Sequence, residues 1–347
     1  MTLDPATNPE SRLRQAAARA SLEALVAQAP ALLTVEQIVR SKFSSKAALL
    51  KEIPEYLLSL GGKRLRPLLA LSSARLFGMH SPSPQLIDVS AGIELIHMAT
   101  LLHDDIIDKS PLRRHRESPF LRYGVPSTLI TGDFLLTRAF SLCARLDRFV
   151  IDATEKACIE LTEGEIEELP LSQRETTLAG VIEVSRRKTA ALFRLSAECG
   201  AHLAGASPHA TELLASCGES IGLAFQVIDD ILDITSSQQV LGKKPGQDLR
   251  EQKPSIVNFI WLAHGSQLAN SLLQTSRDGP PEDDVIERAI TEIMDCGVIE
   301  QARRHALNFS LRAIESLDAL RSCSPQTDAG AAEDLISLVA GAYQRVC

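Results

Sequence analysis

Two short stretches of this sequence each carry three aspartates in the spacing D-D-x-x-D. The triplets are Asp104, Asp105 and Asp108 in the first stretch, and Asp229, Asp230 and Asp233 in the second. On a helix, the first and last aspartate of a triplet lie roughly 40° apart on one face, since the chain turns about 100° per residue. Three carboxylates crowded beside apolar residues repel one another, so the arrangement is unfavourable without a cation.

Ligands that are all carboxylate oxygens suit a hard cation such as Mg²⁺, which keeps waters and shares the oxygens of a bound phosphate. A single D-D-x-x-D stretch is often only a solvated helix end, but two copies in apolar sequence argue against that interpretation. A carboxylate di-iron site would need Glu-x-x-His motifs, and neither stretch has one. The pair therefore predicts two acidic walls that hold a metal–diphosphate between them.

Basic residues lie near both acidic stretches and could complete a diphosphate site. Arg binds phosphate oxygens through two parallel hydrogen bonds, whereas Lys acts as a point charge. One basic group follows the glycine pair Gly61-Gly62, and others follow each acidic stretch or lie within a stretch of helical length. The candidates are Lys63, Arg64, Arg66, Arg113, Arg114, Lys188, Lys243 and Lys253. Each alone would be an ordinary surface residue, and only their grouping favours a site.

The elements that must position these residues are helices. Stretches of helical length lie between proline and glycine breakers, and period-2 alternation is scarce. The stretches are 85–109, 127–145, 151–169, 175–204 and 210–235. Aromatic residues make up only 4% of the chain, which disfavours a β-rich fold. We expect one all-α domain over residues 1–347, with residues 1–20 forming a frayed N-terminal tail.

Composition excludes several classes of protein. The chain has 347 residues, with 36 basic and 44 acidic side chains and a net charge of −8. This acidic balance argues against a nucleic-acid partner, which would need a basic surface. The seven cysteines are scattered without metal-type spacing, as suits reduced thiols. No apolar run reaches the ~20 residues of a transmembrane segment, and no signal pattern opens the chain. We therefore expect a cytoplasmic protein.

The sequence resembles the trans-isoprenyl diphosphate synthases from about Lys51 to beyond Ser255. Seven motifs carry the resemblance and occur in that family's order. They are GGKRLRP, HDDIIDKSPLRR, GDFLL, EGEI, RKTAALF, FQVIDDILD and GKKPGQDL. The resemblance implies an isoprenoid-synthase-type bundle of long helices around a central cavity, usually homodimeric. It also implies that isopentenyl diphosphate and an allylic prenyl diphosphate are the substrates, with three Mg²⁺ ions bridging the allylic diphosphate to the acidic stretches.

The resemblance also implies a role for each matching residue. As metal ligands it implies Asp104, Asp108 and Asp229, with Asp105, Asp230 and Asp233 completing the ligand set. For isopentenyl diphosphate it implies Lys63, Arg66, His97 and Arg114, and for the allylic diphosphate Arg113, Lys188, Lys243 and Lys253. Thr189 and Gln226 would stabilise the allylic carbocation with their oxygen dipoles.

Product length in this family depends on the bulk of residues below the first acidic stretch. Here Ala99 and Thr100, one turn before Asp104, are both small. The resemblance therefore implies an open cavity floor and a long product of about six to ten isoprene units, as in quinone side chains, which is handed to a membrane. The alternative is that Ala99 only allows a tight contact between helices.

Four positions depart from the family pattern: His115, the segment Glu117-Ser118-Pro119, Glu168 where Gln is common, and Gln252 before Lys253. They leave open a catalytically weak or regulatory subunit of a heteromeric synthase, although such subunits typically lose acidic residues that are intact here. A short-chain synthase is a further alternative. A terpene cyclase is disfavoured, because it would not need the paired Lys63 and Arg66.

Overall fold

The computed structural model describes residues 9–19, 30–173, 176–237, 244–275, 279 and 281–343. Within these residues the chain is almost entirely helical. The exception is one antiparallel pair of two-residue strands, β1 (Leu112–Arg113) and β2 (Arg116–Glu117), in which Leu112 pairs with Glu117. This confirms the all-α fold class.

The helices have lengths from one turn to nearly eight turns. In chain order they are α1 (Pro9–Arg19), α3 (Ala31–Ser41), α4 (Leu49–Ser59), α5 (Leu65–Arg75), α6 (Pro84–Ile107), α7 (Pro119–Tyr123), α8 (Val125–Cys143), α9 (Arg148–Glu167), α10 (Leu178–Ser185), α11 (Ala191–Leu203), α12 (Pro208–Thr235), α14 (Gln247–Arg250), α15 (Ile256–Ala263), α16 (Gln267–Leu273), α17 (Asp283–Asp295), α18 (Val298–Cys323) and α19 (Ala329–Tyr343). A 3₁₀ turn, η1 (Leu171–Gln173), and a π-helical turn, η2 (Arg186–Ala190), complete the described elements.

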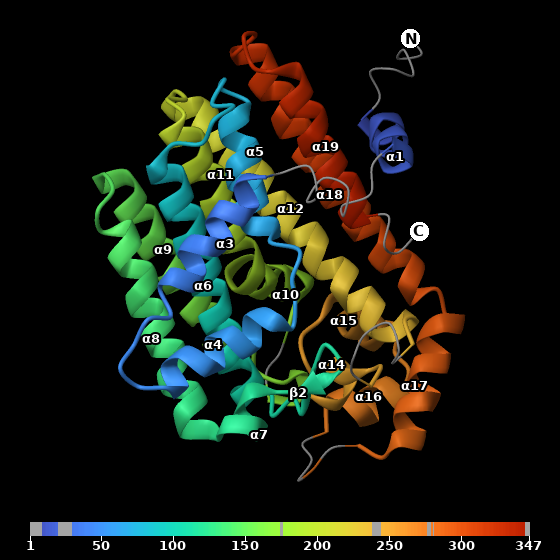
Figure 1. The fold of residues 1–347 in the computed structure, drawn as a ribbon. Helices are drawn as coiled ribbons and strands as arrows, with labels where there is room; N and C mark the ends of the chain where they lie inside the picture. The colour runs from blue at the N-terminus through green and yellow to red at the C-terminus, as the bar shows by residue number, and fades with distance from the viewer. Residues whose placement is uncertain are drawn as a thin grey trace, which may run out of the picture.

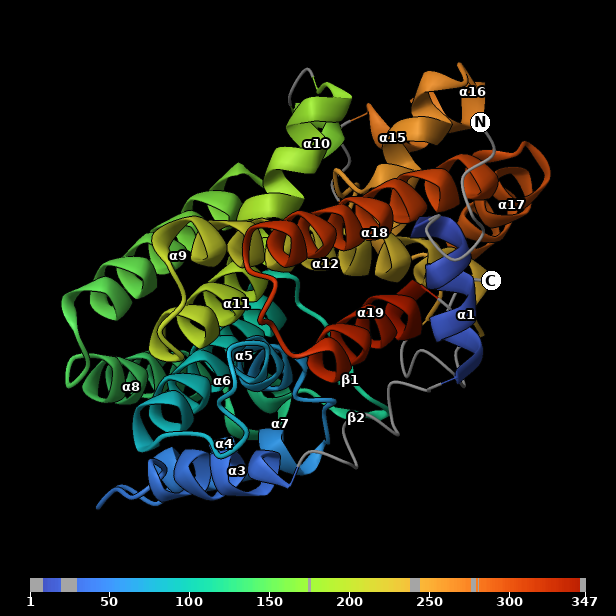
Figure 2. The same ribbon diagram turned by 90° about the horizontal axis from the view of Figure 1, so that it is seen from above.

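The long helices pack directly on one another (Figures 1 and 2). Helix α11 packs against both α6 and α12, the two helices that carry the acidic stretches. Helix α8 covers α6, and α18 covers α12. Both figures show α15, α16 and α17 gathered at one end of α12, and α8 beside α9 along one edge of the molecule.

Serine caps and prolines fix where the two acidic helices begin. The Ser83 side chain accepts a hydrogen bond from the Leu86 amide at the start of α6, and Pro84 occupies the first turn. Ser207 caps α12 in the same way. Because these starts are fixed, both acidic stretches fall near the C-terminal ends of their helices.

Apolar side chains are buried in two clusters. One lies among helices such as α5, α6, α11 and α19, and the other among α12, α15, α17 and α18. Both are mainly aliphatic, and the buried Trp261 donates its indole N–H to Glu292 at 3.0 Å. Helix α6 is the one described helix whose length and composition would suit a membrane span. However, 72% of its most apolar window is buried inside the protein, as in a core helix.

The N-terminal segment differs from the expected frayed tail. Residues 9–19 form α1, which packs against α19 and α18. Leu13 is buried, and the Arg12 guanidinium lies 2.6 Å from the Asp318 carboxylate. The buried apolar side chains Leu13 and Ala16, together with the ion pair of Arg12 and Asp318, hold this mainly polar segment against the C-terminal helices.

Candidate active site

A single cavity of about 1190 Å³ brings together most of the sequence-predicted site residues. Its wall draws on the α4–α5 loop, α6, the β1 region, the end of α9, η2, α12 and the segment after α14. The predicted residues on this wall are Lys63, Arg64, Arg66, His97, Thr100, Asp104, Arg113, Arg114, Lys188, Thr189, Gln226, Asp229, Asp230, Asp233 and Lys253. The fold therefore converts motifs spread over almost 200 positions into one site.

Four predicted residues are not on this wall. Asp105 and Ala99 are buried away from the cavity. Asp108 is half-buried, and its carboxylate contacts Lys253 at the rim. Lys243 lies outside the described residues.

The α6 wall is electrostatically unfavourable when no ligand is present. Burial raises the pKa of Asp104 to about 7, and the carboxylates of Glu165 and Asp108 add to this shift while Lys188 opposes it. Asp104 also lies in the last turn of α6, where the helix dipole is negative. A cation or a proton would relieve all of these costs.

Asp105, the second aspartate of the first acidic stretch, forms an ion pair with Arg113. The Arg113 Nε donates to both Asp105 oxygens at 2.9 Å, and its Nη2 donates to Oδ1 at 2.6 Å. The Asp105 side chain is only 1% exposed. Asp105 is directed toward Arg113, while Asp104 lies on the cavity wall, because adjacent residues of a helix point about 100° apart. Metal ligation by Asp105 stays a prediction.

On α12, Asp230 is held in place by two donors. Gln226 Nε2 donates to its Oδ1 at 2.8 Å, and the Ile256 amide donates to its Oδ2 at 2.9 Å. Burial raises the pKa of Asp230 to about 7, and these two hydrogen bonds oppose that shift. Asp233 Oδ2 accepts from the Asp248 amide at 3.1 Å. These two aspartates therefore anchor α14 and the start of α15 to the acidic wall.

The π-helical turn η2 presents Lys188 and Thr189 to the cavity, as such turns often do at functional sites. Two glycines let neighbouring helices approach it closely. A Cβ on Gly164 of the EGEI motif would lie 2.8 Å from the Arg187 Cβ, and one on Gly222 would lie 2.6 Å from the Ala190 Cα. The glycine of EGEI thus serves packing.

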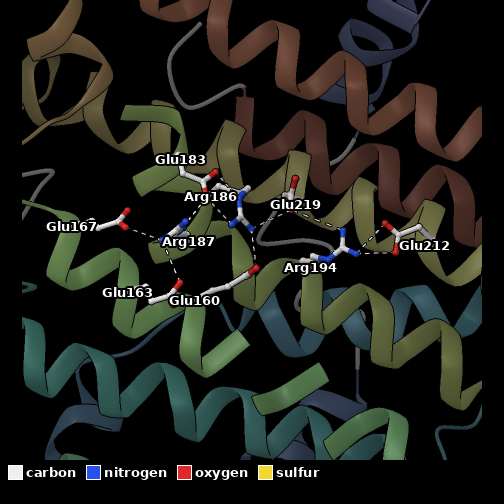
Figure 3. Close-up of polar contacts among 9 residues, drawn as sticks. All are labelled: Glu160, Glu163, Glu167, Glu183, Arg186, Arg187, Arg194, Glu212 and Glu219. Carbon is white, nitrogen blue, oxygen red and sulfur yellow. Dashed lines mark hydrogen bonds and ion pairs between the residues drawn. The ribbon is translucent and has the colours of Figure 1, made fainter. Parts of the chain in front are cut away.

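A network of charges outside the cavity holds η2 (Figure 3). Arg186 contacts Glu183 at 2.8 Å and Glu160 at 3.2 Å, while Arg187 contacts Glu183 at 2.7 Å and Glu167 at 3.0 Å. These pairs join η2 to α9 and α10. They fix the turn from its outer side while Lys188 and Thr189 face inward.

Lys188 and Lys253, two of the lysines on the cavity wall, are ion-paired. Lys188 Nζ lies 2.8 Å from Glu165, and Lys253 Nζ lies 2.8 Å from Asp108 and 3.0 Å from Glu251. Burial lowers the pKa of Lys253, but the carboxylates around it outweigh burial and raise that pKa well above its ordinary value. Both lysines are therefore charged near neutral pH.

Another part of the cavity wall is basic and begins at the glycine pair. Gly61 and Gly62 have φ angles of 91° and 152°, which glycine adopts readily, and Arg64 follows at 50°. The Arg66 guanidinium lies 4.7 Å from the centre of the Phe193 ring. Burial lowers the pKa of Arg66 to about 10. Burial and the surrounding arginines hold the pKa of His97 well below its usual range, so this imidazole is neutral at pH 7.

Glu94 is a wall residue that the motifs did not reveal. It is buried, and its Oε1 accepts from Arg64 Nη1 at 3.1 Å. Arg64 and Glu94 therefore form an ion pair on the cavity wall, which Lys63 and Arg66 also line. Helical spacing could have found it, because Glu94, His97 and Asp104 recur at intervals of three and seven on one face of α6. No spacing in the sequence indicated the ion pairs of Glu165 with Lys188 and of Glu251 with Lys253.

The donor set on the wall fits a hard divalent cation. Asp104, Asp229 and Asp233 reach the cavity from both acidic helices and offer only carboxylate oxygens. Among the described residues, no three His, Cys, Asp or Glu side chains converge closely enough to hold an ion by themselves. A cation that also takes oxygens from water and from a bound phosphate is compatible with both observations.

Comparisons with known proteins agree with this geometry. The family model described as polyprenyl synthetase matches residues 47–293. The octaprenyl diphosphate synthase of Escherichia coli (strain K12) is 32% identical over 288 residues, which cover 82% of this chain and 88% of that relative. The geranylgeranyl diphosphate synthase of Methanosarcina mazei is 30% identical over 279 residues, which cover 78% and 84%.

A solved structure has the same architecture. It is a polyprenyl synthase from Caulobacter crescentus CB15, complexed with calcium and isoprenyl diphosphate. Its TM-score to this chain is 0.84 at 28% identity, covering 94% of this chain and 98% of that one. The similarity therefore extends well beyond the motif-bearing helices.

Proposed function

The chain belongs to the polyprenyl synthetase family, and we propose that it is a Mg²⁺-dependent prenyltransferase that condenses an allylic diphosphate repeatedly with isopentenyl diphosphate. One observation carries the proposal. The cavity has acidic walls from α6 and α12 and a basic wall from the α4–α5 loop, so it can hold two diphosphates with opposite requirements. One would be bound together with a metal, and the other by cationic side chains alone.

The residues that would hold the divalent cation are Asp104, Asp229 and Asp233 on the wall, with Asp108 at the rim. When bound, Mg²⁺ would withdraw charge from the allylic diphosphate and so weaken its carbon–oxygen bond. Lys188 and Lys253 would bind the same diphosphate and stabilise the negative charge that develops as it leaves.

Thr189 and Gln226 would stabilise the allylic cation. The Thr189 hydroxyl donates to Gln226 Oε1 at 2.6 Å, and the Gln226 amide donates in turn to Asp230. Because the hydroxyl proton of Thr189 is donated to Gln226, the lone pairs of Thr189 Oγ1 are available to a neighbouring positive charge. Asp230 thus acts through Gln226, as a positioning residue.

The basic wall would bind isopentenyl diphosphate through Lys63, Arg66 and Arg114, with the neutral His97 as a hydrogen-bonding partner. The double bond of this substrate would attack the allylic cation. The proton lost in forming the new double bond would go to the departing diphosphate. This sequence of steps needs no nucleophilic side chain.

We propose a long product of about six to ten isoprene units. Thr100 is small and lies on the wall, beside apolar side chains that include Leu57, Met98 and Leu101. Names of relatives do not decide the length, because octaprenyl and geranylgeranyl synthases match this chain about equally well. A product of this length would pass to a membrane, while the enzyme itself works in the cytoplasm.

The proposed assembly is a homodimer that forms along the α8–α9 edge (Figure 2). Large apolar side chains are exposed there: Leu129, Ile130, Phe140, Ile159 and Ile166. A second copy of this face would cover them. Light scattering after size exclusion should give twice the chain mass for the wild type, and Ile130→Glu with Phe140→Glu should give a monomer.

The decisive experiment uses the purified chain with radiolabelled isopentenyl diphosphate, a C15 allylic diphosphate and Mg²⁺. Elongated diphosphates support the proposal, and their chromatography gives the product length. A hydrocarbon product would identify a cyclase. Absence of any product would favour a non-catalytic subunit and would overturn the proposal.

A further inference from the structure

Glu168 lies where the diphosphate-binding lysines converge. It follows the last residue of α9, its backbone leaves helical geometry with ψ 53°, and its side chain lines the cavity at 16% exposure. Its Oε2 lies 2.5 Å from Lys188 Nζ and 3.7 Å from Lys253 Nζ. One carboxylate oxygen therefore contacts ammonium groups from η2 and from the segment after α14.

The low solvent exposure around the Glu168 carboxylate strengthens its interaction with the two lysines. The side chains of Lys188 and Lys253 are 17% and 20% exposed, so solvent screens these pairs only partly. Burial alone would lower the pKa of Lys188, but the charge of Glu168 is the largest influence that raises it. The Glu168 carboxylate thus occupies the position between the two ammonium groups, where an anion would interact with both lysines.

We infer, on the basis of the proposed function, that Glu168 is an internal competitor of the diphosphate for Lys188 and Lys253. A diphosphate that reaches these lysines must displace this carboxylate or lie beside it. Either costs free energy unless a divalent cation screens the added negative charge. Glu168 therefore makes diphosphate binding depend more strongly on the metal, and by thermodynamic linkage it makes metal binding depend equally on the diphosphate.

Calorimetric titration of the full chain with inorganic pyrophosphate tests this inference without requiring turnover. Glu168→Gln keeps the size of the side chain and removes its charge. In EDTA, this variant should bind pyrophosphate about tenfold more tightly than the wild type. In saturating Mg²⁺ the difference should fall to about twofold or less, so the gain in affinity that Mg²⁺ confers should be about fivefold or more smaller in the variant.

Glu167→Gln is the matched control. The Glu167 carboxylate is adjacent to Glu168 in sequence but pairs with Arg187 on the outer side of η2. Removing the charge of Glu167 should therefore change pyrophosphate affinity by less than about twofold. Equal tightening in both variants would indicate a general charge effect and overturn the inference. Unchanged or weaker metal-free binding by Glu168→Gln, including no binding by either protein, would also overturn it. The turnover assay on the wild type tests the proposed function separately.

Discussion

Arg113, which lines the cavity, donates three hydrogen bonds of 2.6 to 2.9 Å to the buried Asp105 carboxylate. The middle residue of the first acidic triplet is thereby neutralised by an arginine eight positions later, while Asp104 beside it faces the cavity. The two adjacent aspartates therefore differ in their surroundings. Asp105 joins α6 to the loop that follows it, and Asp104 lies on the cavity wall.

Replacing Asp105 or Asp104 by asparagine should change the stability of the protein in opposite directions. Asp105→Asn leaves Arg113 without its charged partner and should lower the free energy of unfolding by about 1–3 kcal/mol. Asp104→Asn removes a buried carboxylate repelled by Glu165 and Asp108, so it should raise Tm while lowering kcat about 10²–10³-fold. Thermal denaturation and steady-state kinetics check both. A loss of Tm in Asp104→Asn would contradict this division.

Metal removal should abolish turnover and leave the fold intact. The acidic walls would repel a diphosphate that arrives without a cation, so excess EDTA should reduce product to background. Helical circular dichroism should persist, because packing of apolar side chains holds the helices together. Readdition of Mg²⁺ should restore activity, and measurable turnover in excess EDTA would refute the proposed mechanism.

Thr100 should control product length more directly than Ala99. Thr100 lines the cavity, whereas Ala99 is fully buried among helices away from it. Thr100→Phe should shorten the product, as chromatography of radiolabelled diphosphates would show. Ala99→Phe should instead overpack the core and cost about 1–3 kcal/mol of stability. If only Ala99→Phe shortened the product, the floor would lie on the other side of α6.

Gly164→Ala should displace the π-helical turn. The added methyl group would lie 2.8 Å from the Arg187 Cβ and 2.9 Å from the Lys188 amide nitrogen. We expect a raised KM for the allylic diphosphate together with a loss of about 1–3 kcal/mol in stability. Gly205→Ala is the control, because φ there is +82° in open space. It should cost about 1–2 kcal/mol through backbone strain and leave KM unchanged.

The charge network on η2 should make stability depend on acid pH. Hydrogen bonds from Arg186, followed by those from Arg187, lower the pKa of Glu183 to about 2. The stabilisation is therefore fully present above pH ~4.5 and disappears as pH falls through about 2. Glu183→Gln should cost at most about 1 kcal/mol at pH 7, since the side chain is partly exposed. Urea titrations should show this difference vanishing near pH 2; a constant difference would contradict it.

The sequence alone determined the fold class and most of the residues that line the cavity. Helical spacing predicted five stretches that appear as α6, α8, α9, the run from α10 through η2 to α11, and α12. The repeated D-D-x-x-D spacing placed carboxylates on one face of each of two helices. These properties are local, because they follow from the helix period and from proline and serine signals at helix ends.

Only the tertiary structure decided which residue of each neighbouring pair faces the cavity. Successive helical residues point about 100° apart, so the sequence cannot separate Asp104 from Asp105, or Thr100 from Ala99, until the packing of α6 fixes its rotation. Contacts between distant segments were equally inaccessible. Lys253 and Asp108 are 145 positions apart, and their ion pair exists only because the segment after α14 folds against the end of α6. Local sequence thus specified the chemical groups of the site, and tertiary packing decided which of them face the cavity.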